Sequence, residues 1–150
     1  MGNTYTSLHY HLVFSTKHRE PRIHHDIEER VWSFLGGIAR ENGMHPIRIG
    51  GMPDHVHIAV GGPPTLAISK AVQQIKGGSS KWIKDVLPDM KDFAWQDGYG
   101  AFAVSKSSLS TVETYIEKQR EHHRKTTFKE EFLSLLQLHQ IEFDTRYLWD

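Results

Sequence analysis

The order of strand-like and helix-like segments constrains the fold of this chain more than any other feature. Stretches with strand character cover residues 8–16, 45–51, 55–60 and 101–105. Apolar residues at helical spacing cover 26–41 and a second segment that begins at Thr65. The order β-α-β-β-α-β predicts an α+β, ferredoxin-like sandwich with an antiparallel four-stranded sheet and two helices on one face. The first and third strands are expected to be central.

Local signals predict where the helices begin and end. Asp26 is expected to cap the first helix, and Gly77-Gly78 to weaken or kink the second. Two C-terminal helices are expected after the last strand, one capped by Ser107 or Ser108 and running through Arg124, and one from about Phe128 to His139. No repeat, linker or low-complexity tract interrupts the chain, so residues 1–150 are predicted to form a single domain.

Composition excludes several classes of protein and site. The sequence has no cysteine, which excludes disulfides and thiolate metal sites and leaves His, carboxylates, amides and water as ligands. Basic and acidic residues balance at 18 each, which argues against coating of nucleic acid by bulk attraction. The last 25 residues carry a net negative charge, so the remainder is mildly basic and nucleic acid stays open as a partner. No apolar stretch approaches a membrane span and no signal-peptide pattern is seen, so a cytoplasmic protein is expected.

Two histidines lie in the third predicted strand, within the sequence PDHVHIAV. Side chains two apart on a strand share a face and are separated by roughly 6.5–7 Å, so His55 and His57 could bind one cation while Val56 points into the core. The other interpretation, polar residues on the solvent side of the sheet, stays open for an isolated pair. The following IAVGGPP lacks the glutamate of a cupin site, and the spacing is not the helical one of a zincin.

The predicted third helix offers a second pair, Tyr115 and Gln119. Residues four apart share a helical face, so a phenol and an amide oxygen would approach one point. The other interpretation is a partly buried tyrosine beside an exposed glutamine. Among the 11 histidines, His11 on the first strand could lie near the strand of His55 and His57, although a structural role is favoured. Most of the rest are expected at the surface or at helix ends, including His24, His25, His122 and His123.

The motifs together resemble the HUH single-strand transposases, specifically the small tyrosine transposases of bacterial insertion sequences and their relatives associated with repetitive extragenic palindromes. The resemblance runs nearly end to end, through HYHLVFSTKHR, PDHVHIAV, KGGSSKWI, WQDGYGAFAVS, VETYIEKQREHH and YLW. It implies that Tyr115 is the nucleophile, that His55, His57 and Gln119 are metal ligands, and that the metal is Mg or Mn. Imidazole ligands alone would instead favour Zn, Ni or Fe.

The resemblance also implies a reaction and its partners. Tyrosine attack on a DNA phosphodiester would leave a 5′-phosphotyrosine and a free 3′-hydroxyl, on single-stranded DNA and hairpins at element ends. The family forms homodimers with active sites shared between subunits. The candidates for phosphate contacts are basic side chains: Lys17, Arg19, Lys76, Lys81, Lys106 and Arg120. Two other functions are weighed, a domesticated HUH nuclease that acts on chromosomal palindromes and a non-catalytic single-strand-binding module.

Overall fold

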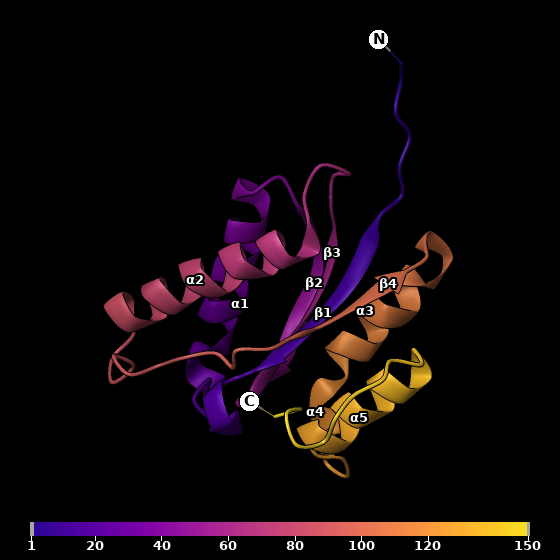
Figure 1. Cartoon of the computed structure of the whole chain (residues 1–150). Helices are drawn as coiled ribbons and strands as arrows, with labels where there is room; N and C mark the ends of the chain where they lie inside the picture. Colours follow the sequence, from indigo (N-terminus) through magenta and orange to yellow (C-terminus); the bar gives the residue numbers. More distant parts are fainter. Residues whose placement is uncertain (1, 150) are drawn as a thin grey trace.

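A four-stranded antiparallel sheet lies between two layers of helices in the computed structural model, which describes residues 2–149 (Figure 1). Its strands are β1 (His9–Ser15), β2 (His45–Met52), β3 (His55–Gly61) and β4 (Gly100–Val104). The strand order β2-β3-β1-β4 makes the first and third strands central, as predicted. The α+β fold class is therefore confirmed.

The helices divide between the two faces of this sheet. Their bounds are α1 (His25–Glu41), α2 (Ile68–Val86), α3 (Leu109–Glu117), α4 (Gln119–His122) and α5 (Phe128–Leu138). Helices α1 and α2 cover one face, as the ferredoxin-like pattern predicts, and the C-terminal helices α3, α4 and α5 lie on the other (Figure 1). Both faces of the central strands are consequently shielded from solvent.

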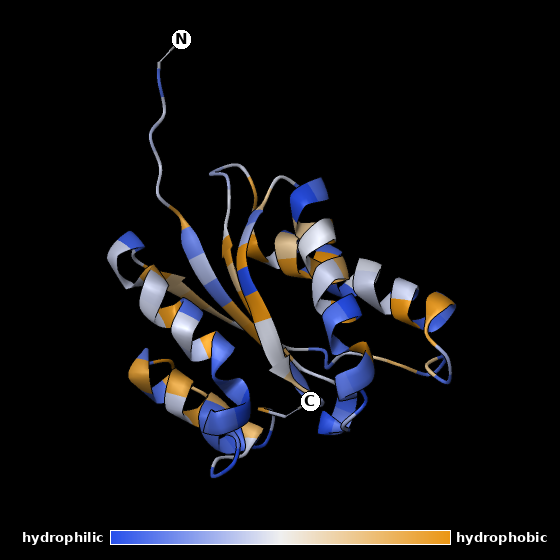
Figure 2. Cartoon of the chain, turned by 180° about the vertical axis from the view of Figure 1, so that it is seen from behind, coloured by the Kyte–Doolittle hydropathy of each residue, from blue (hydrophilic) through white to orange (hydrophobic). Residues whose placement is uncertain are grey.

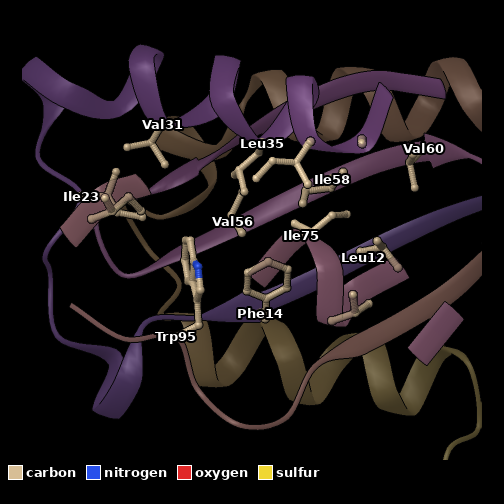
Figure 3. Packing of buried hydrophobic residues seen from close by; sticks show 14 of the residues in the cluster. Leu12, Phe14, Ile23, Val31, Leu35, Val56, Ile58, Val60, Ile75 and Trp95 are labelled. Atoms are coloured by element: carbon tan, nitrogen blue, oxygen red, sulfur yellow. The ribbon is translucent and has the colours of Figure 1, made fainter. Parts of the chain in front are cut away.

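Alternation along the central strands sends side chains into two separate cores. Leu12, Phe14, Val56 and Ile58 face α1 and α2, where Phe14 meets the indole of Trp95 edge-on at 4.9 Å between ring centroids (Figure 3). The opposite face is packed by a second apolar cluster, formed by Val13, Phe102, Phe128, Phe132 and Leu136. Hydrophobic and hydrophilic residues accordingly alternate along the strands, and the longer helices carry both kinds (Figure 2).

Two predicted helix starts are wrong. Helix α1 begins at His25 after an extended His24, so Asp26 lies inside the first turn instead of capping it, where its charge still favours the positive end of the helix dipole. Helix α2 begins at Ile68, not at Thr65, because residues 63–66 form a turn in which the Leu66 N–H donates to the Pro63 carbonyl.

Gly77-Gly78 does not interrupt α2, which is continuous from Ile68 to Val86. A Cβ at position 78 would lie 2.9 Å from Cδ1 of Ile38 in α1, so this glycine permits close packing of two helices. The predicted third helix is also wrong in extent: α3 ends at Glu117, Lys118 leaves helical geometry at φ −96°, ψ 22°, and α4 follows. Ser108 precedes α3 without a capping side-chain hydrogen bond.

Candidate active site

His55 and His57 lie on the face of β3 that is covered by α3 to α5, and both side chains are 0% exposed. The strand register places Gly50 of β2 and Val13 of β1 on either side of His57. The interpretation of these histidines as polar residues on a solvent-facing sheet surface is therefore wrong. Two buried imidazoles on a central strand require polar partners, and these come from the helical layer.

The Nδ1 atoms of both histidines are held by neighbouring side chains. Nδ1 of His55 lies 2.7 Å from Oδ1 of Asp54, and Nδ1 of His57 lies 2.8 Å from Nε2 of His11. These contacts fix the two rings so that both Nε2 atoms point toward the C-terminal helices. His11, which was expected to be structural, thus contacts the site directly through His57.

Tyr115 and Gln119 reach the histidines from the helical layer. Oε1 of Gln119 lies 2.9 Å from Nε2 of His55, and the rings of Tyr115 and His57 are 5.6 Å apart. Gln119 is buried, whereas Tyr115 is only partly buried at the edge of the site. The four residues singled out by sequence therefore meet within one chain, although α3 and α4 are separated at Lys118.

Two further residues belong to the site and were missed in the sequence. Oε1 of Glu131, in α5, lies 3.0 Å from Nε2 of His57 and 3.2 Å from Nε2 of His123. Ligand atoms of His55, His57, His123 and Glu131 all lie within 4.8 Å of one another, which makes these three histidines and one glutamate a possible metal site.

Both missed residues carried a signal in the sequence. His123 follows Gln119 by four positions and so shares its helical face. It was expected at the surface or at a helix end; it lies at the end of α4, and its side chain is only 6% exposed. Glu131 lies within the buried stripe of α5, between Phe128 and Phe132, where an acidic residue needs a polar partner.

Burial and the neighbouring carboxylates oppose each other at both buried histidines, and the net pKa shifts have opposite directions. Burial alone would lower the pKa of His55, but hydrogen bonds with Asp54 and Glu131 outweigh it and raise the pKa to about 9. Burial dominates for His57 and lowers its pKa to about 4. Burial and the nearby charge of Glu131 raise the pKa of Tyr115 above its ordinary value. Burial opposes ionisation of Glu131, but hydrogen bonds with His123, His55 and His57 hold its pKa well below the usual range.

A groove of about 660 Å³ opens beside the tyrosine. It runs between β4, α3 and α5, and Tyr115, Glu131, His11 and His122 contribute to its wall. Most of the remaining wall is apolar, with Phe102 stacked on His139 at 4.4 Å between ring centroids. The groove gives access to the phenol side of the cluster, whereas His55 and His57 stay behind it.

The six basic residues proposed for phosphate contacts lie in different environments. Lys17 and Lys106 are exposed, and no ion pair within residues 2–149 involves either of them. Arg19 donates to the Trp149 carbonyl. Lys81 pairs with Asp85 and Arg120 pairs with Glu28, both on exposed helix surfaces.

Lys76 differs from the other five. Its ammonium donates to the carbonyls of Gln96, Asp97 and Gly98, and burial lowers its pKa to about 8. This lysine holds the loop before β4, so its donors are already occupied by backbone carbonyls.

Comparison with known proteins identifies the family. The family described as "Transposase IS200 like" matches residues 4–119, a range that includes the two histidines of β3, Tyr115 and Gln119. The chain belongs to this family. The match ends before His123 and Glu131, so these two candidate ligands lie outside the matched range.

Relatives and solved structures agree with this assignment. The ISDra2 transposase TnpA of Deinococcus radiodurans is 29% identical over 119 residues, which cover 76% of this chain and 85% of that protein. The transposase of insertion sequence IS200 from Salmonella typhimurium is 25% identical over 130 residues, covering 83% and 84%. A crystal structure assigned to a Deinococcus radiodurans transposase superposes with a TM-score of 0.65 at 29% identity, covering 79% of this chain and 96% of the other.

A second solved structure shares the fold at lower identity. It is a REP-associated tyrosine transposase bound to a REP hairpin, with a TM-score of 0.60, 13% identity, and coverage of 82% of this chain and 73% of the other. Within residues 2–149, no helix of this IS200-family transposase is both long and apolar enough to cross a membrane.

Proposed function

We propose that this transposase cleaves and rejoins single-stranded DNA through a 5′-phosphotyrosine formed by Tyr115. The observation that carries the proposal is the meeting of a partly buried phenol, two buried histidines and a buried glutamine in one cluster. The single accessible nucleophile in that cluster is the phenol, and the groove of about 660 Å³ leads to it.

The donor set fits a divalent cation. Nε2 of His55 and of His57, with Oε1 of Gln119, would hold Mg or Mn as the resemblance implies, and His123 and Glu131 offer two further ligands. Imidazole nitrogen and carboxylate oxygen together suit Mn as well as Zn, so the ligand atoms alone leave the metal's identity open. When bound, such a cation polarises phosphoryl oxygens and favours the phenolate over the phenol.

The chain's own residues perform the covalent step. The Tyr115 oxygen attacks the phosphorus, the new O–P bond forms as the P–O3′ bond breaks, and the net transfer of one proton runs from the phenol to the departing 3′-oxygen. The 3′-hydroxyl of another strand later reverses the step. Because the phosphodiester energy is conserved in the tyrosine link, no nucleotide hydrolysis is required.

The proposed substrate is single-stranded DNA with a hairpin at the ends of the element. The bound hairpin of the REP-associated relative supports a hairpin ligand for this fold. Exposed Lys17 and Lys106 are the strongest candidates for phosphate contacts, because the other four basic residues already have partners.

The test uses single-stranded oligonucleotides from the DNA that flanks the gene. Protein is incubated with each oligonucleotide and Mn²⁺ or Mg²⁺, and a covalent adduct is sought by denaturing electrophoresis. Tyr115→Phe should abolish the adduct. Tyr5→Phe, at an 88% exposed tyrosine in the segment before β1, is the matched control and should leave it unchanged. An adduct that persists in Tyr115→Phe assigns the nucleophile elsewhere.

The same experiment separates the remaining functions. Cleavage of palindromes scattered over the chromosome, with no terminal hairpins beside the gene, would indicate the domesticated nuclease. Binding that survives chelation and His57→Ala without any adduct would indicate a single-strand-binding module.

A further inference from the structure

We propose that Glu131 is the positioning residue for Tyr115, holding the phenol with one carboxylate oxygen while the other oxygen lies in the histidine cluster. The inference rests on the proposed function of Tyr115 as nucleophile. In this proposal α5, which lies beyond the residues matched to the family, contributes a residue to the active site.

The two oxygens of Glu131 face different partners. Oε2 accepts hydrogen bonds from the Tyr115 hydroxyl and, at 3.0 Å, from Nε2 of Gln119. Oε1 lies within 3.3 Å of Nε2 of His55, His57 and His123. One carboxylate therefore spans the distance between the nucleophile and the candidate metal ligands, and its orientation sets the direction in which the phenol points.

Within residues 2–149, the hydrogen-bond contact of the phenol with His122 is longer than its contact with Glu131. Nε2 of His122 lies 3.5 Å from the Tyr115 oxygen, at the outer limit of a hydrogen bond, and the His122 side chain is 34% exposed. Tyr115 itself is only partly buried, so packing alone leaves its ring freedom to move. A fixed acceptor reduces that freedom, and alignment of a nucleophile contributes strongly to its rate.

The burial of Glu131 argues for a function beyond packing. Its side chain is 1% exposed, and within residues 2–149 every ion-pair partner of this carboxylate is a histidine. Burying a carboxylate without a Lys or Arg partner is costly. An apolar residue would continue the stripe formed by Phe128, Phe132 and Leu136 at lower cost.

Helix α5 holds Glu131 rigidly in this position. The Thr127 hydroxyl accepts from the Glu130 N–H while the Glu130 carboxylate accepts from the Thr127 N–H, a capping box that fixes the first turn. Phe128 and Phe132, on either side of Glu131, are buried against the sheet. The carboxylate is thus directed inward by a capped and packed helix.

The adjacent Glu130 provides a matched control. It has the same charge and lies on the same helix, but it is exposed and its carboxylate serves the cap. Glutamine also completes a capping box, so Glu130→Gln removes one negative charge from α5 without disturbing the site. Glu131→Gln removes the same charge from the cluster and keeps the side-chain volume.

The experiment measures Mn²⁺ binding by calorimetry and single-turnover adduct formation at saturating Mn²⁺, in the full-length protein and both variants. Glu131→Gln should weaken Mn²⁺ binding about 10–100-fold. It should also slow adduct formation about 100-fold even when Mn²⁺ saturates the site, because the phenol has lost its fixed acceptor. Glu130→Gln should match the wild type in both measurements.

Each other outcome overturns the inference in a distinct way. Recovery of the rate to within threefold of wild type at saturating Mn²⁺ would make Glu131 a metal ligand alone, and unchanged binding and rate would make it structural. If Glu131→Gln does not fold, Glu131→Asp keeps the buried charge but withdraws the carboxylate by one methylene, and the same rate criterion applies. Absence of any adduct in the wild type would instead reject the proposed function, whatever the Mn²⁺ affinities.

Discussion

Gly50 allows the tyrosine helix to lie directly on the sheet, and Gly50→Ala tests whether that approach sets the activity. Gly50 pairs with His57 in the register between β2 and β3. A Cβ at this position would lie 3.0 Å from Cγ2 and 3.2 Å from the carbonyl oxygen of Ile116. The side-chain atom can rotate away, but the carbonyl belongs to the backbone of α3. Helix α3, which carries Tyr115 as the preceding residue, must therefore shift outward.

The size of the shift separates its effect on activity from its effect on stability. Restoring contacts of about 3.5 Å requires a movement of roughly 0.3–0.5 Å. Overpacking of this kind costs about 1–3 kcal/mol, and the lower chain entropy of unfolded alanine offsets about 0.4–1 kcal/mol. At about 2–4 °C per kcal/mol, Tm should fall by no more than about 10 °C. Displacing a nucleophile by a fraction of an ångström should slow its reaction about tenfold or more.

Single-turnover adduct formation and thermal unfolding of the same preparations measure the two effects. Gly77→Ala is the control, since a Cβ there meets nothing within 4 Å on the surface of α2. It should raise stability by about 0.5–1 kcal/mol and leave the rate unchanged. A Gly50→Ala protein that forms the adduct at the wild-type rate would refute the argument that this close approach aligns Tyr115.

Three measurements address the surroundings of the tyrosine. His11→Phe removes the partner of Nδ1 of His57 and should weaken Mn²⁺ binding about tenfold by calorimetry, whereas unchanged affinity would assign His11 to packing alone. With its pKa raised to about 9, His55 stabilises the metal-free fold fully below about pH 6.5, and this contribution is lost as pH rises through 9. Between about pH 6.5 and 9, Tm in EDTA should therefore fall. Mn²⁺ affinity should rise by up to about tenfold per pH unit, because the cation displaces the proton on His55. An affinity that does not change with pH would contradict the role of His55 as a metal ligand. An equimolar mixture of Tyr115→Phe and His57→Ala proteins should form no adduct, since the phenol lies beside His57 of its own chain, and an adduct would establish a site shared between subunits.

Strand alternation carried most of the information about the fold. The pattern around Val56 and Ile58 separated a packing face from a histidine face, because residues two apart on a strand must share a side. The position of the helical layer over the second face could not be predicted from strand alternation. That position depends on contacts of Phe128 and Phe132 with Val13, which lies far from them in the sequence and meets them only after the chain has folded.

Only part of the site could be predicted from the sequence, for a related reason. His55, His57, Tyr115 and Gln119 occur at spacings that local geometry converts into a shared face, whereas Glu131 meets them from a separate helix. The expectation of active sites shared between subunits came from the resemblance. That expectation stays a prediction; within the single chain, the tyrosine and the histidines lie together, with Glu131 in contact with both.

The charges of the cluster bear on both folding and the proposed metal binding. Asp54 and Glu131 supply negative charge on either side of His55, which favours a proton on its Nε2 and satisfies the buried carboxylate. A divalent cation would compete with that proton for the same nitrogen and for the Glu131 carboxylate. Because the proton and the cation would share His55 and Glu131, the cluster would keep its arrangement as one replaces the other. The direction of the Tyr115 phenol, which Oε2 of Glu131 would hold, would then be set before the metal binds.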